Sequence, residues 1–95
     1  MDQKKSEAFY IRLREQLQET TKWPSDYLYK FIVLSEPEKI AQIHKIFDNT
    51  GAVIESKLSK KGKYTSVSVT VNLNSPEEVI VKYKEVSQVE GVISL

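Results

Sequence analysis

The residues that could do chemistry are few, and His44 is the first of them. It is the only histidine in the chain, and its imidazole is the one side chain expected to titrate near neutral pH. A general base needs a nucleophile or an orienting carboxylate within reach, and the nearest acid in sequence is Asp48, one helical turn further on. We therefore expect an exposed helical histidine that interacts with Asp48 rather than a catalytic base.

Other reactive groups are scarce. The chain has no cysteine, which excludes disulfides, thiol nucleophiles and thiolate metal sites, and a single histidine cannot form a histidine cluster. The two arginines, Arg12 and Arg14, precede the expected core, so a small phosphatase would lack the arginine that holds its phosphate. The sequence thus argues against covalent, metal and phosphoryl chemistry.

Two acidic pairs have a structural explanation. Glu36 with Glu38 and Glu77 with Glu78 fall where first helical turns are expected, and the helix dipole favours acids there. Carboxylate pairs placed this way need no catalytic role. We predict no catalytic residue, no metal site, no cofactor, and a protein that is not an enzyme.

A lysine-rich turn is the main candidate for recognition. Its glycine, Gly62, permits a positive φ, which leaves backbone N–H groups pointing outward beside the lysine ammonium groups. An anionic group of a partner protein or of a small molecule would match it. The candidate binding residues are those of the turn and the adjacent polar strand positions: Ser59, Lys60, Lys61, Gly62, Lys63, Tyr64, Ser66 and Ser68. Alternatively, the glycine only closes a hairpin and the lysines keep its tip soluble.

RNA binding is the alternative function. RNA-recognition modules share the expected topology and stack bases on aromatic residues of the two central strands. Lys61-Gly62 precedes Tyr64, and three aromatic residues alternate at positions 27, 29 and 31. After Tyr64, however, the same strand face offers Ser66, Ser68 and Thr70, which cannot stack a base.

Composition narrows the class further. The 95 residues suit one domain, and 40% hydrophobic with 28% charged residues is typical of a folded globule. The net charge of +1 is too small to attract the whole protein to nucleic acid or to anionic lipid. No run of eighteen apolar residues and no signal-peptide pattern occur, so we expect no membrane association and a cytoplasmic location.

The first part of the chain predicts a helix outside the core. Between residues 6 and 19, Phe9, Leu13 and Leu17 recur every fourth position, which gives a thin apolar stripe. Proline after Trp23 favours extended geometry, so the helix should end by Lys22. We expect an N-terminal helix and linker over residues 1–22 and a folded domain over residues 23–95.

The rest of the chain alternates strands and helices. Residues 27–34 read as an interior strand with both faces largely covered, and residues 52–57, 64–73 and 92–95 as further strands. Ser35 and Ser75 each precede a proline and a glutamate three residues on, the pattern of a capping box, and each should cap a helix. This β-α-β-β-α-β order predicts an α+β, ferredoxin-like fold, a four-stranded antiparallel sheet with two helices on one face.

The third strand predicts an uncovered sheet face. Thr65, Val67, Val69, Val71 and Leu73 share one side, and Tyr64, Ser66, Ser68, Thr70 and Asn72 share the other. The polar side could be covered by the N-terminal helix, by a second copy or by water. We favour the helix or a homodimer through this open face.

Several of these residues resemble a known family. The run from Ser59 to Val69, SKKGKYTSVSV, together with Trp23-Pro24 and Tyr83, is similar to the bacterial YbeD-like family, also called domain of unknown function 493. The resemblance spans residues 23–95 and implies a ferredoxin-like fold similar to ACT regulatory domains, which bind small molecules between paired domains. It implies no established activity. We therefore expect a non-catalytic regulatory or interaction domain of ACT-like fold, although Ser35-Glu36-Pro37 stands where many ACT domains carry a glycine-bearing ligand loop.

Overall fold

The computed structural model describes residues 3–94. Its elements in chain order are helix α1 (Gln3–Thr20), strand β1 (Ser25–Leu34), helix α2 (Pro37–Ile46), strand β2 (Val53–Leu58), strand β3 (Tyr64–Leu73), helix α3 (Pro76–Val86) and strand β4 (Ile93–Ser94). In this part of the chain no helix has the length and apolarity needed to cross a membrane.

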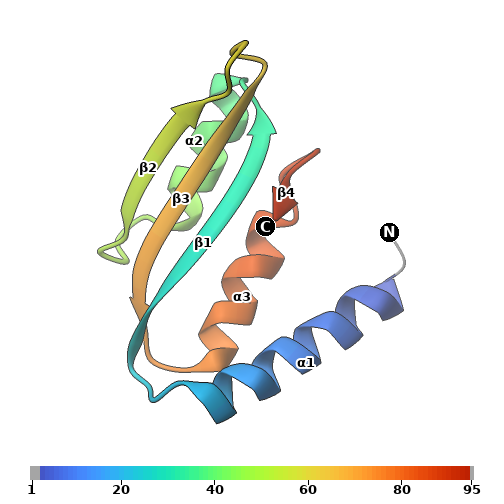
Figure 1. Ribbon diagram of the computed structural model, residues 1–95, viewed down its shortest axis with the longest axis vertical. Coiled ribbons are helices and arrows are strands. Elements are labelled where there is room, and N and C mark those ends of the chain that lie inside the picture. The colour runs from blue at the N-terminus through green and yellow to red at the C-terminus, as the bar shows by residue number, and fades with distance from the viewer. Residues whose placement is uncertain (1–2, 95) are drawn as a thin grey trace.

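The strands form one antiparallel sheet in the order β2-β3-β1-β4. Figure 1 shows the long β1 and β3 side by side in the centre, with β2 at one edge and the short β4 at the other. The element succession after α1 confirms the predicted α+β, ferredoxin-like arrangement. The last strand begins at Ile93, one residue later than predicted, and its predicted end at Leu95 lies outside the described residues.

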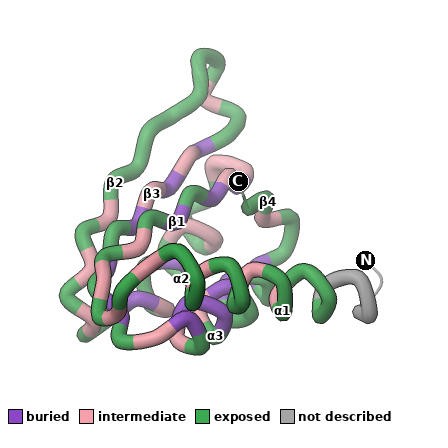
Figure 2. Tube along the Cα trace, turned by 60° about the horizontal axis from the view of Figure 1, so that its bottom comes forward, coloured by how far each residue is buried: buried purple, intermediate pink, exposed green. Residues whose placement is uncertain are grey.

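The sheet has one buried and one open face. Every residue of the predicted apolar side of β3, from Thr65 to Leu73, is buried. On β1, Tyr29, Phe31 and Val33 are buried, whereas Leu28 and Lys30 are exposed. The prediction that both faces of this strand are largely covered is therefore wrong, because all the helices lie on one side of the sheet (Figure 2).

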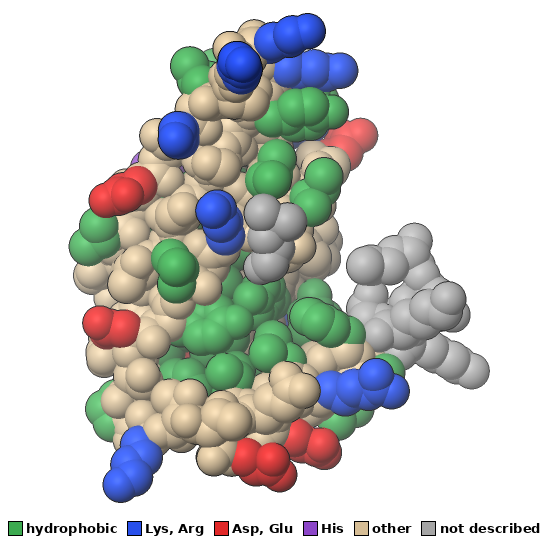
Figure 3. All heavy atoms as spheres, in the orientation of Figure 1, with side chains coloured by type: hydrophobic (Ala, Val, Ile, Leu, Met, Phe, Trp, Pro, Cys, Tyr) green, Lys and Arg blue, Asp and Glu red, His purple; other side chains and the backbone are tan. Residues whose placement is uncertain are grey.

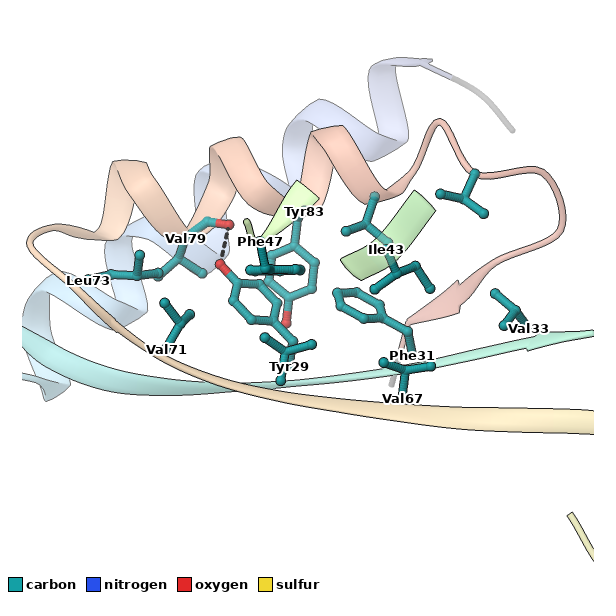
Figure 4. Packing of buried hydrophobic residues seen from close by; sticks show 13 residues of the cluster. Tyr29, Phe31, Val33, Ile43, Phe47, Val67, Val71, Leu73, Val79 and Tyr83 are labelled. Atoms are coloured by element: carbon teal, nitrogen blue, oxygen red, sulfur yellow. Dashed lines mark hydrogen bonds between the residues drawn. The ribbon is translucent and has the colours of Figure 1, made fainter. Parts of the chain in front are cut away.

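Aromatic side chains fill the core between the sheet and the helices α2 and α3 (Figure 4). The Tyr29 ring centroid lies 4.8 Å from that of Tyr83 and 5.3 Å from that of Phe47. The Tyr29 hydroxyl donates a hydrogen bond of 2.9 Å to the carbonyl oxygen of Val79 on α3. Tyr83 shares a 2.8 Å hydroxyl–hydroxyl bond with Tyr27. These bonds satisfy polar groups that would be costly to bury alone.

Only one of the two predicted serine caps forms, and the reciprocal bond of its glutamate goes to the residue before the cap. Ser75 caps α3 by accepting a hydrogen bond from the Glu78 N–H, and the Glu78 carboxylate accepts one from the Asn74 N–H. The N-cap of α2 is Glu36, whose side chain makes no capping bond. Ser35 was expected there, but its hydroxyl instead bonds the Thr65 hydroxyl at 2.8 Å.

Helix α1 packs along α3, on the helical side of the sheet (Figure 1). Its Tyr10, Leu13 and Leu17 are partly buried against the core cluster, and the Trp23 indole N–H donates to the Leu17 carbonyl at 3.3 Å. The expectation that this helix covers the open sheet face is therefore wrong. An amphipathic helix is stabilised by burying its apolar stripe, and the apolar flank of α3 is available for that.

Candidate interaction surface

The lysine-rich turn joins β2 to β3 as a tight hairpin. The Ser59 N–H donates to the Tyr64 carbonyl and the Gly62 N–H to the Ser59 carbonyl, both at 2.8 Å. The Ser59 hydroxyl accepts from the Tyr64 N–H at 3.1 Å. Gly62 has a φ of 74°, as predicted, and only glycine adopts that value without strain. The turn therefore has a defined backbone shape.

The tip of this hairpin presents cationic groups to solvent. Lys60, Lys61 and Lys63 are all exposed, and no hydrogen bond formed within the described chain uses their backbone N–H groups. The Lys63 ammonium lies 5.5 Å from the centroid of the Tyr64 ring. Figure 2 shows the tip projecting beyond the helices, which leaves it open to a large partner.

The base of the hairpin is fixed to the end of β1. The Ser35 N–H donates to the Lys63 carbonyl at 2.9 Å, and the Ser35 hydroxyl bonds that of Thr65, which is 2% exposed. These two contacts tie the loop after β1 to the first residues of β3. These hydrogen bonds fix the position of the hairpin that carries the lysines.

The open face continues the tip as one surface. The predicted residues Tyr64, Ser66 and Ser68 point to this face, and the structure brings all eight predicted binding residues onto the hairpin and the adjoining part of β3. We call these residues the hairpin surface. Whether they bind anything stays a prediction.

Sheet register adds two cations that the sequence prediction of the site left out. Lys57 of β2 and Ile32 of β1 lie opposite Ser66, whereas Lys30 of β1 and Glu55 of β2 lie opposite Ser68. Figure 3 shows Lys and Arg side chains gathered at the hairpin end and continuing down this face. Lys57 precedes Ser59 by two residues, so the sequence alone places it near the lysine-rich turn. Lys30 could be placed only once the strand pairing was known.

The predicted histidine arrangement does not form. His44 is exposed on α2, but the ion pairs within the described residues are Lys39–Glu36 and Lys82–Glu85, and neither includes it. Helix α2 ends at Ile46, and the turn that follows takes Asp48 out of the helical position assumed for the pair. Among the described residues, His44 thus lacks the predicted ion pair with Asp48.

Other reactive constellations are missing from residues 3–94. No three histidine, cysteine, aspartate or glutamate side chains there are grouped so that they could hold a metal ion. Burial raises the pKa of the Tyr29 and Tyr83 phenols far above their usual value, so both remain neutral hydrogen-bonding groups at physiological pH. Their role is therefore to pack and to form hydrogen bonds within the core.

The aromatic residues expected for base stacking face the wrong way. Tyr29 and Phe31 have no exposed surface and Tyr27 is half-buried, all on the helical side. Of the aromatic residues proposed for stacking, only Tyr64 is exposed on the open face, at 40%. This arrangement removes the main support for the RNA-binding alternative, because bases would have to stack on the open face.

Two hollows of the described chain lie away from the hairpin surface. One, of about 560 Å³, lies between α2 and α3 and is lined by Gln42, Lys45, Ile46, Glu85, Gln88 and Val89. A smaller one, of about 250 Å³, lies between α1 and α3 around Tyr10 and Val81. Neither contains a residue of the hairpin surface.

Comparisons with known proteins are consistent with the sequence resemblance. A family model described as "Protein of unknown function (DUF493)" matches residues 18–95. A UPF0250 protein of Erwinia tasmaniensis is 31% identical over 83 residues, covering 84% of this chain and 95% of its own length. UPF0250 proteins of Edwardsiella ictaluri and Buchnera aphidicola are each 34% identical over 86 residues, with the same coverage. No solved structure matches the chain.

Proposed function

This chain belongs to the family described as DUF493, proteins of unknown function, and we propose that it is a non-catalytic interaction domain whose hairpin surface binds an acidic segment of a partner protein. The observation that carries the proposal is the projecting turn with Lys60, Lys61 and Lys63, which are exposed and whose backbone N–H groups donate no hydrogen bond within the described chain. Carboxylates are the natural match for both kinds of donor.

The shape of the surface favours a protein over a small molecule. Small-molecule sites are concave and enclose most of the ligand, whereas the hairpin is a protruding tip that joins a broad sheet face. The two hollows that could enclose a ligand are on the helical side. A small anion would find few groups around it at the tip.

The remaining features of the surface suit a flexible acidic segment. Lys57 beside Ser66 and Lys30 beside Ser68 extend the positive charge from the tip along the open face, where Glu55 adds one negative charge. Tyr64, Ser66 and Ser68 supply uncharged hydrogen-bonding groups along β3. A regulatory role, through a partner that this domain recruits or blocks, follows from binding without chemistry. A cytoplasmic location and a bacterial source stay predictions.

Charge reversal at the tip tests the proposal. We expect a fluorescent ten-residue glutamate peptide to bind the parent protein at low salt and to dissociate as salt is raised. Lys61→Glu with Lys63→Glu should weaken binding at least about tenfold, or about 1.4 kcal/mol, with little change in thermal stability. The matched control is Lys22→Glu with Lys45→Glu, which changes two exposed lysines outside the hairpin surface by the same charge and should bind as the parent does.

Three results would contradict this function. Equal loss of peptide binding in both double variants would indicate a general charge effect. Tighter, tip-dependent binding of a uridine dodecamer than of the peptide would favour the RNA alternative. Reproducible turnover of a substrate that is lost in His44→Ala would favour an enzyme.

A further inference from the structure

We propose that the free edge of β1, residues 25–29, binds an extended segment of a partner protein as an added sheet strand. On one side β1 pairs with β3 over all ten of its residues. On the other side, among the residues that the structure describes, β4 pairs only with Phe31 and Ile32. In that register Lys30 stands opposite residue 95, which the structure does not describe, so the proposed edge ends at Tyr29.

The backbone of this edge selects an extended partner. In an antiparallel sheet, alternate residues of a strand direct their N–H and C=O groups to opposite neighbours, so every second residue from 25 to 29 presents both groups away from β3. Within the described chain, the one other hydrogen bond to this stretch of backbone is a long one, 3.4 Å, from the Ser25 hydroxyl to the Asp26 carbonyl. A row of alternating donors and acceptors about 17 Å long is matched by another strand.

An apolar hollow lies beside the same edge. Figure 3 shows hydrophobic side chains gathered in a depression between β1 and the helix α3. Tyr27 and Trp23 are both only partly buried against the core cluster near the start of β1. An added strand would direct every second side chain into this depression and the others over the open face beside Leu28, which is 60% exposed. The partner segment should therefore carry apolar residues at alternate positions.

The charge nearest this edge does not block it. Proteins often protect free strand edges with charged side chains. Asp26 is the one charged residue between 25 and 29, and its carboxylate accepts a 3.0 Å hydrogen bond from the Asn72 amide on β3. The side chain is thus held over the sheet rather than across the edge. The opposite edge, β2, carries Glu55 and Lys57 exposed in its middle.

A single segment fits this edge better than a second copy of the chain. Figure 1 shows α3 and α1 extending past β1 on the helical side, where the helices of a second copy would have to be placed. Strand β4 also closes one end of the free edge, so an antiparallel β1 from another copy could pair over only a few residues before meeting it. One extended peptide avoids both obstacles.

The experiment selects a peptide and then locates it. A phage library of random twelve-residue peptides is selected on the full chain, and the best peptide is synthesised with a fluorescent label. Two N-methylated versions of this peptide are then made. In one phase the odd-numbered residues carry the backbone N-methyl groups, and in the other phase the even-numbered residues carry them. We expect one phase to weaken binding more than tenfold and the other to change it less than threefold, because only one set of peptide N–H groups faces β1.

Two single-cysteine variants locate the peptide. The chain has no cysteine, so Leu28→Cys and Val53→Cys each carry one benzophenone photocrosslinker. The two positions are matched controls, since both lie opposite Thr70 and are 60% and 61% exposed, one on β1 and the other on β2. Crosslinking from position 28 should exceed that from position 53 at least fivefold. The Lys61→Glu, Lys63→Glu variant should keep the parent's affinity within twofold, which separates this edge from the hairpin surface.

Four outcomes of the peptide experiments would overturn the proposal, and a fifth comes from the oligomeric state. They are failure to select any peptide, equal weakening by both N-methylation phases, crosslinking from position 53 as strong as from position 28, and loss of binding in the hairpin double variant. Concentration-dependent dimerisation that the peptide reverses would also overturn it, in favour of a second copy at this edge.

Discussion

Tyr29 combines the functions of packing and hydrogen bonding at the centre of the core. Its ring has no exposed surface and its hydroxyl is bonded to the Val79 carbonyl of α3. Burial is the main cause of its raised pKa, and the neighbouring Tyr83 adds to it, because a second tyrosinate would be repelled there. The phenol is therefore held in its neutral form.

Alkaline pH should expose this effect. An unfolded tyrosine loses its proton near pH 10 while buried Tyr29 and Tyr83 keep theirs, so above that pH the unfolded state binds fewer protons. The two phenols make their full contribution to the free energy of unfolding below pH 10. Above pH 10 the free energy of unfolding falls, by up to about 1.4 kcal/mol per pH unit for each proton that the unfolded state has lost. Urea unfolding between pH 8 and pH 11.5 measures the slope, which Tyr29→Phe should make shallower.

A control separates titration from general weakening. Ser75→Ala destabilises the fold without removing a phenol, so it should keep the steep alkaline slope of the parent. A Tyr29→Phe protein that loses stability with pH as steeply as the parent would contradict the assignment.

At the scale of elements, two similar sequences have different roles. In SPEE, Ser75 directly precedes Pro76 at the first helical position and so becomes the N-cap of α3. In SEPE, Glu36 stands between Ser35 and Pro37, and the cap position falls on Glu36. Ser35 therefore lies one residue before the cap of α2, where its hydroxyl bonds that of Thr65.

Substitutions should distinguish these roles. Ser75→Ala removes a cap and should cost about 1 kcal/mol of unfolding free energy. Ser35→Ala should cost a similar amount for another reason, since it leaves the buried Thr65 hydroxyl without its partner. Adding Thr65→Val to Ser35→Ala should recover most of that loss, whereas adding it to Ser75→Ala should not. Chemical denaturation of six proteins, namely the parent, the three single variants including Thr65→Val and the two double variants, measures both cycles, and simple additivity in both pairs would contradict this prediction.

These elements also mark what the sequence can predict. The period-two pattern of residues 64–73 identified β3 and its buried side correctly, because only one side of that strand is apolar. Residues 27–34 are apolar on both sides, so their pattern could not reveal that the face of Leu28 and Lys30 is exposed. The position of the proline after Ser35 did contain the information that the cap falls on Glu36.

The part of the hairpin surface that is formed by neighbouring residues in the sequence could be predicted, and the rest could not. Gly62 and the lysines beside it are local in sequence, and the structure places them as one turn. Lys30 comes beside Ser68 only through the register of β1 with β3, which joins residues far apart in the chain. The free edge of β1 depends on where β4 pairs with β1, at Phe31 and Ile32, which no local pattern fixed.

At the scale of the whole molecule, the two layers give the sheet one open face and one covered face. The sheet presents the hairpin surface on its open side, and the helices cover the other (Figures 1 and 2). Helix α1 adds an outer layer to the helical side by packing on α3. It therefore contributes to stability without covering either proposed binding surface.

Removing α1 should weaken the domain without unfolding it. A chain that starts at Thr21 loses the partly buried Tyr10, Leu13 and Leu17, which together correspond to about 2–4 kcal/mol if each buries half of its side chain. The remaining sheet, α2 and α3 keep the buried core cluster, and the family match begins at residue 18. We expect a folded protein with a lower urea midpoint and glutamate-peptide binding equal to that of the full chain.

The tryptophan reports the same change directly. Trp23 is the one tryptophan of the chain, and its indole N–H is bonded to the Leu17 carbonyl, so truncation should shift its fluorescence toward that of solvent-exposed indole. Leu13→Ala in the full chain should give an intermediate midpoint, since it removes one of the three apolar contacts and keeps the helix. An unchanged midpoint and emission after truncation would mean that α1 does not dock on α3 in solution, and weaker peptide binding would mean that α1 takes part in the hairpin surface.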